Sequence, residues 1–381
     1  MRRGLALRLL LAVALHVFVG QGVLAPDEET YDSNGIRLAR YWAGDSPFRP
    51  IQPFVQGEPR AYYFLVATQY LILGHWPLLP KLVNALCGAV TIRIVFDLAL
   101  RVTGNANVAL RAAQYSAFFP SLVLWSVLNI RDCWVVMMIV LICRQALRLQ
   151  DRPGVNNALV LSLAIWALSH FRAYLLFAVT LPVALTFFVR GRGHVVRNVM
   201  IGMLAIAVIV VSDASSGFRG IDLQDLQRRR SWSASVSGSG FAAEADISTP
   251  QGAIAFLPVG LTYFFLAPFP WAITNALQAL TLPEMLFFYS LLPSLVGGVR
   301  RILSTRLAES LMLALITAAL SIGYAVGQGN VGTMYRHRSQ VLPLLMIFVA
   351  VGKQARRQVA GSARATAAAS PMRASPAQPR R

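Results

Sequence analysis

Long apolar segments are the feature that most constrains the fold of this chain. Of its 381 residues, 56% are hydrophobic and 13% are charged, and the mean hydropathy is +0.56. A helix needs about 20 apolar residues to cross a bilayer, and successive segments approach or exceed that length. We therefore predict an all-α, polytopic transmembrane helix bundle of about ten spans, with further interfacial or re-entrant helices. The predicted spans are 5–24, 79–100, 107–128, 133–149, 157–170, 172–189, 198–212, 284–298, 307–326 and 340–352.

Basic residues set the predicted topology. The formal charge of +19 comes almost entirely from arginine, and basic loops favour the cytoplasmic side of a membrane. The arginine-rich loops 144–152 and 190–197 fall inside only if 61–74 does not cross, so we predict that this short segment is re-entrant or interfacial. The proline-broken segment 253–271 is predicted as another partial insertion. Both termini are then cytoplasmic, and the expected location is the cell inner (plasma) membrane.

The chain is predicted to form one transmembrane domain, residues 1–353, with outer loops at 25–60 and 213–252. The Ala/Arg/Ser/Pro-rich segment 354–381 is predicted to be a disordered, basic cytoplasmic tail. A chain this basic could bind nucleic acid, but no nucleic-acid motif is visible and we expect no such partner. The cysteines and histidines show no metal-ligand spacing, so neither a metal nor a cofactor is predicted.

A cluster of acidic residues follows the first apolar segment: Asp27, Glu28, Glu29 and Asp32. Charge at a membrane boundary is costly unless it faces water or a partner, so the cluster is a functional hypothesis. The alternative is a solvated loop that only holds the first helix in place. Under the predicted topology most acidic residues lie at the outer face, which places any chemistry on that side.

Two further charged sites reach the same face: the Arg131-Asp132 pair and the segment Tyr335-Arg336-His337-Arg338. Arginine forks bind phosphate oxygens in bidentate fashion, and a carboxylate near a hydroxyl can act as a general base. Together these sites suit transfer from a lipid phosphate. The alternatives are that Arg131-Asp132 is a local ion pair, and that the late arginines only anchor a helix to headgroups.

The order and spacing of these residues resembles the GT-C superfamily of polyprenyl-phosphate-sugar-dependent glycosyltransferases, in particular its protein O-mannosyltransferase and aminoarabinose transferase branch (family 39-like). Family members carry an acid at the start of the first outer loop, which Asp27-Glu28 matches. Tyr31 and the helix after it look like the family's juxtamembrane helix. Residues 58–63 resemble a segment that often reads Lys-Pro-Pro-Leu-Tyr-Tyr, with the basic residue displaced, and Arg131-Asp132 is similar to the second acidic site.

The resemblance implies an inverting, metal-independent hexosyl- or pentosyltransferase. Such an enzyme moves a sugar from a polyprenyl-phosphate donor to a lipid, glycan or protein acceptor at the outer face. Asp27 would take the proton of the acceptor, with Glu28 as its neighbour or substitute, and Asp132 would orient an arginine or the acceptor. The implied donor-phosphate ligands are Arg60, Arg131, Arg336 and Arg338, and the acceptor-side or other residues are Tyr31, Glu58, Tyr335 and His337.

Two other functions remain open. A polysaccharide (O-antigen-type) polymerase joins lipid-pyrophosphate repeats with outer-loop arginines, which 228–230 and 336–338 could supply. Replacement of Asp27 by asparagine should matter less in such an enzyme than in a glycosyltransferase. A lipid or polysaccharide flippase would need charges along a path at mid-membrane depth, whereas most ionisable residues here lie at span ends.

Overall fold

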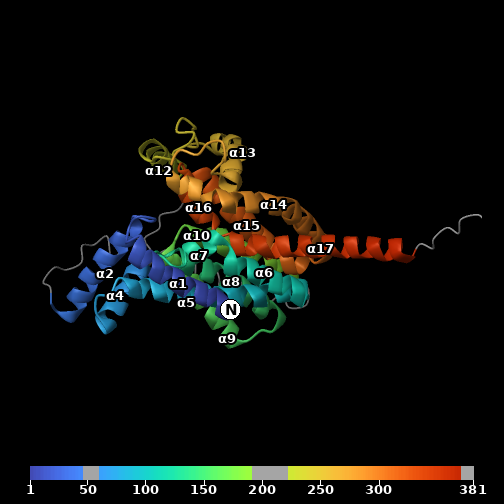
Figure 1. Cartoon of the computed structure of the whole chain (residues 1–381), viewed down its shortest axis with the longest axis horizontal. Helices are drawn as coiled ribbons and strands as arrows, with labels where there is room; N and C mark the ends of the chain where they lie inside the picture. The colour runs from blue at the N-terminus through green and yellow to red at the C-terminus, as the bar shows by residue number, and fades with distance from the viewer. Residues whose placement is uncertain (46–59, 191–221, 370–381) are drawn as a thin grey trace, which may run out of the picture.

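The structure is a computed structural model that describes residues 1–45, 60–190 and 222–369 (Figure 1). In this part of the chain every regular element is a helix, and the predicted all-α bundle is confirmed. The helices are α1 (Arg2–Phe18), α2 (Asp27–Ala43), α4 (Arg60–Leu73), α5 (Leu78–Thr103), α6 (Ala106–Phe118), α7 (Pro120–Leu124), α8 (Asp132–Asp151), α9 (Val155–Phe171), α10 (Leu175–Arg190), α12 (Leu223–Val236), α13 (Pro250–Leu266), α14 (Ala276–Thr305), α15 (Leu307–Gly327), α16 (Val331–Arg338) and α17 (Leu342–Ala369).

Three of these helices are long and apolar enough to cross a membrane: α5, α14 and α15. Shorter apolar helices include α9, α10 and α13. Within the described residues the predicted count of ten spans is not confirmed. The predicted span 198–212 lies outside the described residues, as does the predicted site residue Glu58.

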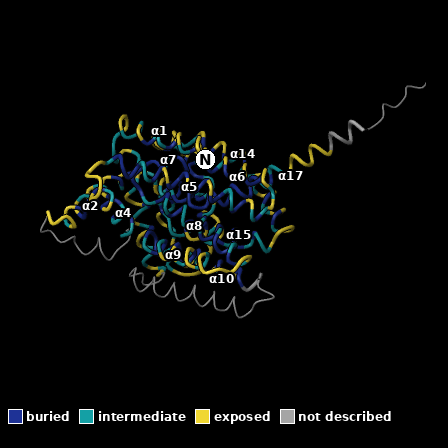
Figure 2. Tube along the Cα trace, turned by 90° about the horizontal axis from the view of Figure 1, so that it is seen from below, coloured by how far each residue is buried: buried dark blue, intermediate teal, exposed yellow. Residues whose placement is uncertain are grey.

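The centre of the bundle is α5, which packs against α1, α6 and α8, while α8 also packs against α9. Figure 2 shows that α5 and α8 lie in the buried interior, whereas residues 356–362 of α17 are exposed. Helices α14 and α17 cross closely because glycines meet at the crossing. A Cβ atom at Gly298 would lie 1.9 Å from the carbonyl oxygen of Phe348, and one at Gly352 would lie 1.9 Å from that of Ser294.

The predicted span 107–128 is not one helix, and proline explains the break. Phe119 is extended (φ −65°, ψ 123°) because the ring of Pro120 disfavours a helical conformation in the residue before it. The chain therefore ends α6 at Phe118, makes the short α7, and runs non-helically to Asp132. This irregular segment carries the Arg131-Asp132 pair into the interior of the protein.

The acidic cluster is helical rather than looped. Helix α1 ends before Gly20 and Gly22, whose φ angles of +84° and +81° lie in the left-handed region that favours glycine. Helix α2 then begins at Asp27, and acids in a first turn are favoured by the helix dipole. It pairs with α4, which covers most of the segment predicted as re-entrant or interfacial.

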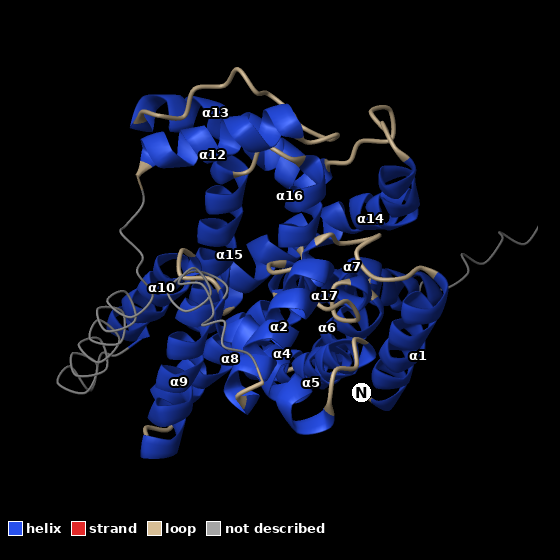
Figure 3. Cartoon of the chain, turned by 90° about the vertical axis from the view of Figure 1, so that its left-hand side faces the viewer, coloured by secondary structure: helices blue, strands red, loops and turns tan. Residues whose placement is uncertain are grey.

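The polar segment after residue 221 forms a cap over one end of the bundle (Figure 3). Helices α12 and α13 lie there, beside α15 and α16. Arg228 and Arg229 are exposed and pair with Asp225, but Arg230 is fully buried over the ring of Phe256, 4.3 Å from its centroid. At the other end of the chain, α17 continues to Ala369, so 354–369 is helical where a disordered tail was predicted.

Candidate functional site

Helix α16 is capped at its N-terminus and carries three basic residues in its last turn. The side chain of Asn330 caps the helix by accepting hydrogen bonds from the backbone N–H groups of Gly332 (2.7 Å) and Thr333 (3.2 Å). The three basic side chains lie in its last turn, where the helix dipole favours positive charge. A short turn then leads into α17.

Arg336 joins two carboxylates that come from distant parts of the chain. Its Nη1 donates to Oδ2 of Asp27 at 2.6 Å, at the start of α2. Its Nε and Nη2 both lie near Oδ2 of Asp132, at 2.8 and 2.6 Å. The side chain of Asp27 is 51% exposed, whereas that of Asp132 is fully buried. The three charged sites found in the sequence therefore each contribute one residue to a single cluster: Asp27, Asp132 and Arg336.

Asp132 is buried but fully hydrogen-bonded, which is the condition under which a charge is tolerated inside a protein. Its Oδ1 accepts from Nη2 of Arg172 at 2.9 Å and from Nε2 of Gln340 at 3.2 Å. Its Oδ2 is occupied by Arg336. One carboxylate thus fixes two guanidiniums, which come from the α9–α10 turn and from α16.

Arg172 extends the cluster to His337. Nη1 of Arg172 lies 2.7 Å from Nε2 of His337 and also donates to the hydroxyl of Tyr174. Burial, with the positive charge of Arg172 beside it, holds the pKa of His337 well below its usual range. His337 is therefore a neutral imidazole that accepts a hydrogen bond from Arg172, and it helps to hold that arginine.

Glu28 does not share the position of Asp27. It is fully buried, and its Oε1 lies 3.0 Å from Nζ of Lys81 and accepts from the backbone N–H of Asn129 at 2.8 Å. Its Oε2 accepts from the N–H of Gly22 at 3.2 Å. These contacts anchor the start of α2 to α5 and to the segment before Asp132, so the geometry makes Glu28 a structural anchor.

A second buried hydrogen-bond network, centred on Asn84, holds the segment 128–134. Nδ2 of Asn84 donates to the carbonyl oxygens of Leu128 (2.7 Å) and Ile130 (3.0 Å), and its Oδ1 accepts from Nε1 of Trp134 at 2.8 Å. The hydroxyl of Tyr62 donates to Oδ1 of Asn129 at 2.8 Å. Because 128–134 is held by α2, α4 and α5, the position of Asp132 is set before any ligand binds.

Replacing Lys81 by methionine is expected to destabilise the protein by about 3–5 kcal/mol, because it leaves the buried carboxylate of Glu28 without its cation. Thermal unfolding of the purified protein measures this effect. The double variant Glu28→Gln/Lys81→Met removes both charges and is expected to recover much of the loss. A Lys81→Met protein as stable as the wild type would show that the pair is not a buried anchor.

Arg338 and Tyr335 point away from the Asp27 cluster, into a second buried group. Nη2 of Arg338 donates to the carbonyl oxygen of Ala267, and its guanidinium lies over the rings of Phe288 and Tyr335. Burial lowers the pKa of Arg338 to about 10, although Glu284 opposes this. Glu284 in turn accepts from the hydroxyl of Tyr335 at 2.8 Å. The hydrogen bonds of Arg338 and Tyr335 therefore go to Ala267 and Glu284, and not to Asp27 or Asp132.

Three other predicted residues lie around the cluster. Tyr31 is buried against Tyr62, with ring centroids 4.7 Å apart, and burial raises its pKa to about 12 against the charges of Arg131 and Arg336. Arg131 donates from Nη1 to the carbonyl oxygen of Phe171 at 2.7 Å. Arg60 begins α4 and is half-buried.

Arg172, Gln340 and Lys81 take part in these contacts and were not predicted from the sequence. One signal for Arg172 was available: it follows the predicted span 157–170, which under the predicted topology ends at the outer face. Lys81 is one of only two lysines, and it lies just inside an apolar span. Gln340 carried no signal, because a glutamine at the start of an apolar helix is common in any membrane protein.

Comparison with known proteins finds similarity in solved structures and none in sequence families. No protein-family model matches the chain, and no curated protein matches it. Among solved structures it resembles the archaeal oligosaccharyltransferase AglB from Archaeoglobus fulgidus, in complex with an inhibitory peptide and a dolichol-phosphate. The TM-score is 0.51 at 14% sequence identity, over 98% of this chain and 52% of the other. The fold is GT-C-like.

This likeness concerns the fold of the helical bundle, and the chain spans about half the length of the protein it matches. At 14% identity it shows a shared fold and does not select the protein O-mannosyltransferase or aminoarabinose transferase branch. In the described residues no three side chains among His, Cys, Asp and Glu are grouped so that they could hold a metal ion.

Proposed function

We propose that this protein is a membrane glycosyltransferase that moves a sugar from a polyprenyl-phosphate donor to an acceptor at the outer membrane face. The observation that carries the proposal is the placement of Arg336 between a half-exposed carboxylate, Asp27, and a buried one, Asp132. A base open to solvent and a fixed cation are thereby held within one hydrogen bond of each other. Transfer from a phosphate-linked sugar needs both groups.

Asp27 is the general base of the proposed reaction. Its Oδ2 is bound to Arg336, and the exposure of the side chain leaves the carboxylate open to an acceptor hydroxyl. The acceptor oxygen forms a bond to the anomeric carbon of the sugar while the bond from that carbon to the phosphate oxygen breaks. The proton of the hydroxyl goes to Asp27, and the polyprenyl phosphate leaves with the electron pair. The anomeric configuration is inverted in a single displacement.

Arg336 is the group proposed to stabilise the departing phosphate. Nη1 and Nη2 each use one N–H on a carboxylate, and each nitrogen carries a second N–H that no described residue accepts. Two N–H groups on one guanidinium suit the oxygens of a phosphate. Burial would lower the pKa of Arg336, but Asp132 and Asp27 raise it above its usual range. The guanidinium therefore stays charged throughout the reaction.

The fold supports a lipid-phosphate donor, because the solved structure it resembles was determined with a dolichol-phosphate. Metal independence is also part of the proposal. The guanidinium of Arg336 already occupies the position between Asp27 and Asp132 that a divalent cation would have to take.

A donor panel tests the proposal. Purified protein in liposomes is given radiolabelled polyprenyl-phosphate sugars together with lipid, glycan and peptide acceptors, and released polyprenyl phosphate is measured. The expected result is release of the monophosphate, with label transferred to one acceptor class. Consumption of a polyprenyl-pyrophosphate oligosaccharide, with no use of any monophosphate donor, would instead show a polymerase and contradict the proposal.

A further inference from the structure

A set of charged side chains lies where the second halves of α5 and α8 pack against each other. Spacings of three and four residues place the members from each helix on one face of that helix. We call this set the α5–α8 ladder: Arg93, Asp97 and Arg101 from α5, and Arg144, Arg148 and Asp151 from α8.

Ion pairs join the two sides of the α5–α8 ladder. Oδ1 of Asp97 lies 3.2 Å from Nη2 of Arg93 on the same helix, and its Oδ2 accepts from Nη2 of Arg144 at 2.9 Å. One turn further along, Arg101 donates to Asp151 of the facing helix. The charges of the two helices therefore meet at one place.

Arg148 lies in this set without an ion pair of its own. Its side chain makes no hydrogen bond or salt bridge to any residue that the structure describes. The charges that act on it are those of Arg144, Arg101, Asp97 and Arg93, which are three cations and one anion. Because four arginines share two aspartates, the α5–α8 ladder has a net charge of +2.

The ladder is open to its surroundings at a depth where charge is costly. The side chain of Arg93 is 63% exposed. Helix α5 is long and apolar enough to cross a membrane, and Arg93 lies about 15 Å along its axis from the last residue, Thr103. An ionisable side chain at such a depth faces water or a partner, and it indicates a functional site.

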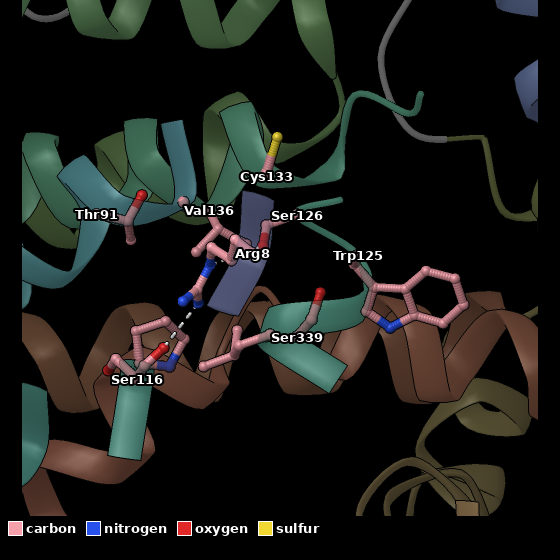
Figure 4. Close-up of a pocket in the computed structure, with 11 residues that line it drawn as sticks. Arg8, Thr91, Ser116, Trp125, Ser126, Cys133, Val136 and Ser339 are labelled. Carbon is pink, nitrogen blue, oxygen red and sulfur yellow. Dashed lines mark hydrogen bonds between the residues drawn. The ribbon is translucent and has the colours of Figure 1, made fainter. Parts of the chain in front are cut away.

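A cation that the bundle encloses is treated differently. Arg8 of α1 is 1% exposed and lies among residues of the bundle interior (Figure 4). Its guanidinium donates to Oγ of Ser126 at 2.9 Å and to the carbonyl oxygens of Ala117 (2.8 Å) and Ser116 (3.1 Å). Arg93, by contrast, makes a single ion pair within the described chain and is exposed. The protein surrounds Arg8 with its own acceptors and leaves the ladder accessible to a ligand.

Apolar surface continues the ladder along α5, away from Thr103. Val90 and Leu86 lie three and seven residues before Arg93, on the same face of the helix, and are 48% and 49% exposed. A molecule with an anionic head and a hydrocarbon tail matches this order, with its head at the arginines and its tail along the apolar side chains. A free phosphate ion would use only the arginines.

We propose that the α5–α8 ladder binds the phosphate headgroup of an anionic phospholipid. Guanidinium groups bind phosphate oxygens strongly, and basic pockets between membrane helices bind lipid headgroups. Arg101 lies about 30 Å along α5 from Lys81, which anchors α2. The lipid therefore belongs to the leaflet opposite the Asp27 cluster, and the proposal does not rest on the proposed sugar transfer.

Native mass spectrometry of the purified, delipidated protein measures this binding. The protein is titrated with phosphatidylglycerol, and separately with phosphatidylcholine that has the same acyl chains but no net charge. We expect one phosphatidylglycerol molecule to bind at a concentration well below that needed for phosphatidylcholine. Equal affinity for the two lipids would overturn the proposal.

Arg148→Gln is the most specific variant, because its side chain makes no described hydrogen bond and the fold should therefore survive the change. Loss of one basic side chain beside an anionic headgroup should weaken phosphatidylglycerol binding about fivefold. The double variant Arg93→Gln/Arg148→Gln should weaken it by roughly 25-fold. Wild-type affinity in a folded Arg148→Gln protein would contradict the proposal.

The matched control is Arg356→Gln, which removes an exposed arginine from the part of α17 that projects from the bundle (Figure 1). It lowers the total charge by the same amount as Arg148→Gln and should keep the affinity of the wild type. A loss in Arg356→Gln equal to that in Arg148→Gln would show attraction by overall charge, and would contradict a site at the ladder.

Inorganic phosphate distinguishes a lipid headgroup from a free ion. The unfolding temperature is measured in detergent at constant ionic strength, with phosphatidylglycerol or with sodium phosphate added. We expect a saturable rise with the lipid, because a ligand that binds the folded state stabilises it, and no rise with phosphate. An equal rise with sodium phosphate that Arg148→Gln abolishes would show a site for free phosphate, and the proposal would be wrong.

Discussion

Replacing Arg336 by glutamine is expected to lower sugar transfer by about 10²–10³-fold, which is the effect of removing one preorganised donor from a developing charge. Arg336 is the residue that Asp27 and Asp132 share, and its two remaining N–H groups are the proposed ligands of the donor phosphate. Glutamine keeps hydrogen-bonding capacity but removes the charge and the fork. The measurement is the initial rate of transfer from the donor that the panel identifies.

Two comparisons make this result specific. Arg229→Gln removes an exposed arginine of α12 that pairs with Asp225, and should leave transfer unchanged. Arg336→Lys keeps the charge and loses the fork, so transfer should remain well below that of the wild type. If Arg336→Gln transfers sugar at the rate of the wild type, the guanidinium is not the phosphate ligand. Loss of activity in Arg229→Gln would favour an arginine-driven polymerase.

Asp132→Asn is expected to have the largest effect on stability among the site variants. The change leaves the guanidiniums of Arg172 and Arg336 close together without the carboxylate that separates them. Breaking a buried ion pair by removal of one partner destabilises a protein by about 3–5 kcal/mol. Transfer should fall as well, because Arg336 would lose the contact that fixes it. Thermal unfolding and the transfer assay measure the two effects.

The matched control for this variant is Asp225→Asn. Asp225 also accepts from two arginines, Arg228 and Arg229, but all three side chains are exposed, and exposed pairs contribute little to stability. The control should unfold at the temperature of the wild type. If Asp132→Asn unfolds at that temperature too, the buried cluster is not what holds α8, α16 and the α9–α10 turn together.

The helical bundle and the meeting of three charged sites could be predicted from the sequence, but the roles of adjacent residues could not. Asp27 and Glu28 are consecutive in α2, so their side chains point about 100° apart on the helix. Only Asp27 reaches Arg336, and Glu28 reaches Lys81. Because the segment was predicted as a loop, nothing in the sequence assigned different roles to Asp27 and Glu28.

Helix α16 separates two nearby basic residues in the same way. Arg336 and Arg338 are two residues apart, which places them about 200° apart around a helix, on opposite faces. One faces the two carboxylates and the other faces Phe288 and the carbonyl oxygen of Ala267. Both were predicted as phosphate ligands because no pattern in the sequence indicated an eight-residue helix between two apolar segments.

The partner of a buried charge was also beyond sequence reasoning. Arg172 and Asp132 are 40 residues apart, and Lys81 and Glu28 belong to different helices, so only tertiary packing pairs them. The break at Pro120 shows the opposite case. A proline at that position predicts a helix end by local sterics, and the break inside the expected span 107–128 was missed because apolar length was given more weight than this local rule.

The most direct test of the account is the rate of transfer by Asp27→Asn compared with the wild type, at matched folding. Asp27 is half-exposed at the start of α2, so asparagine should leave the unfolding temperature close to that of the wild type. The account predicts that this folded variant loses about 10²–10⁴-fold in transfer, because asparagine cannot accept the proton of the acceptor. Wild-type transfer by a folded Asp27→Asn protein would contradict it.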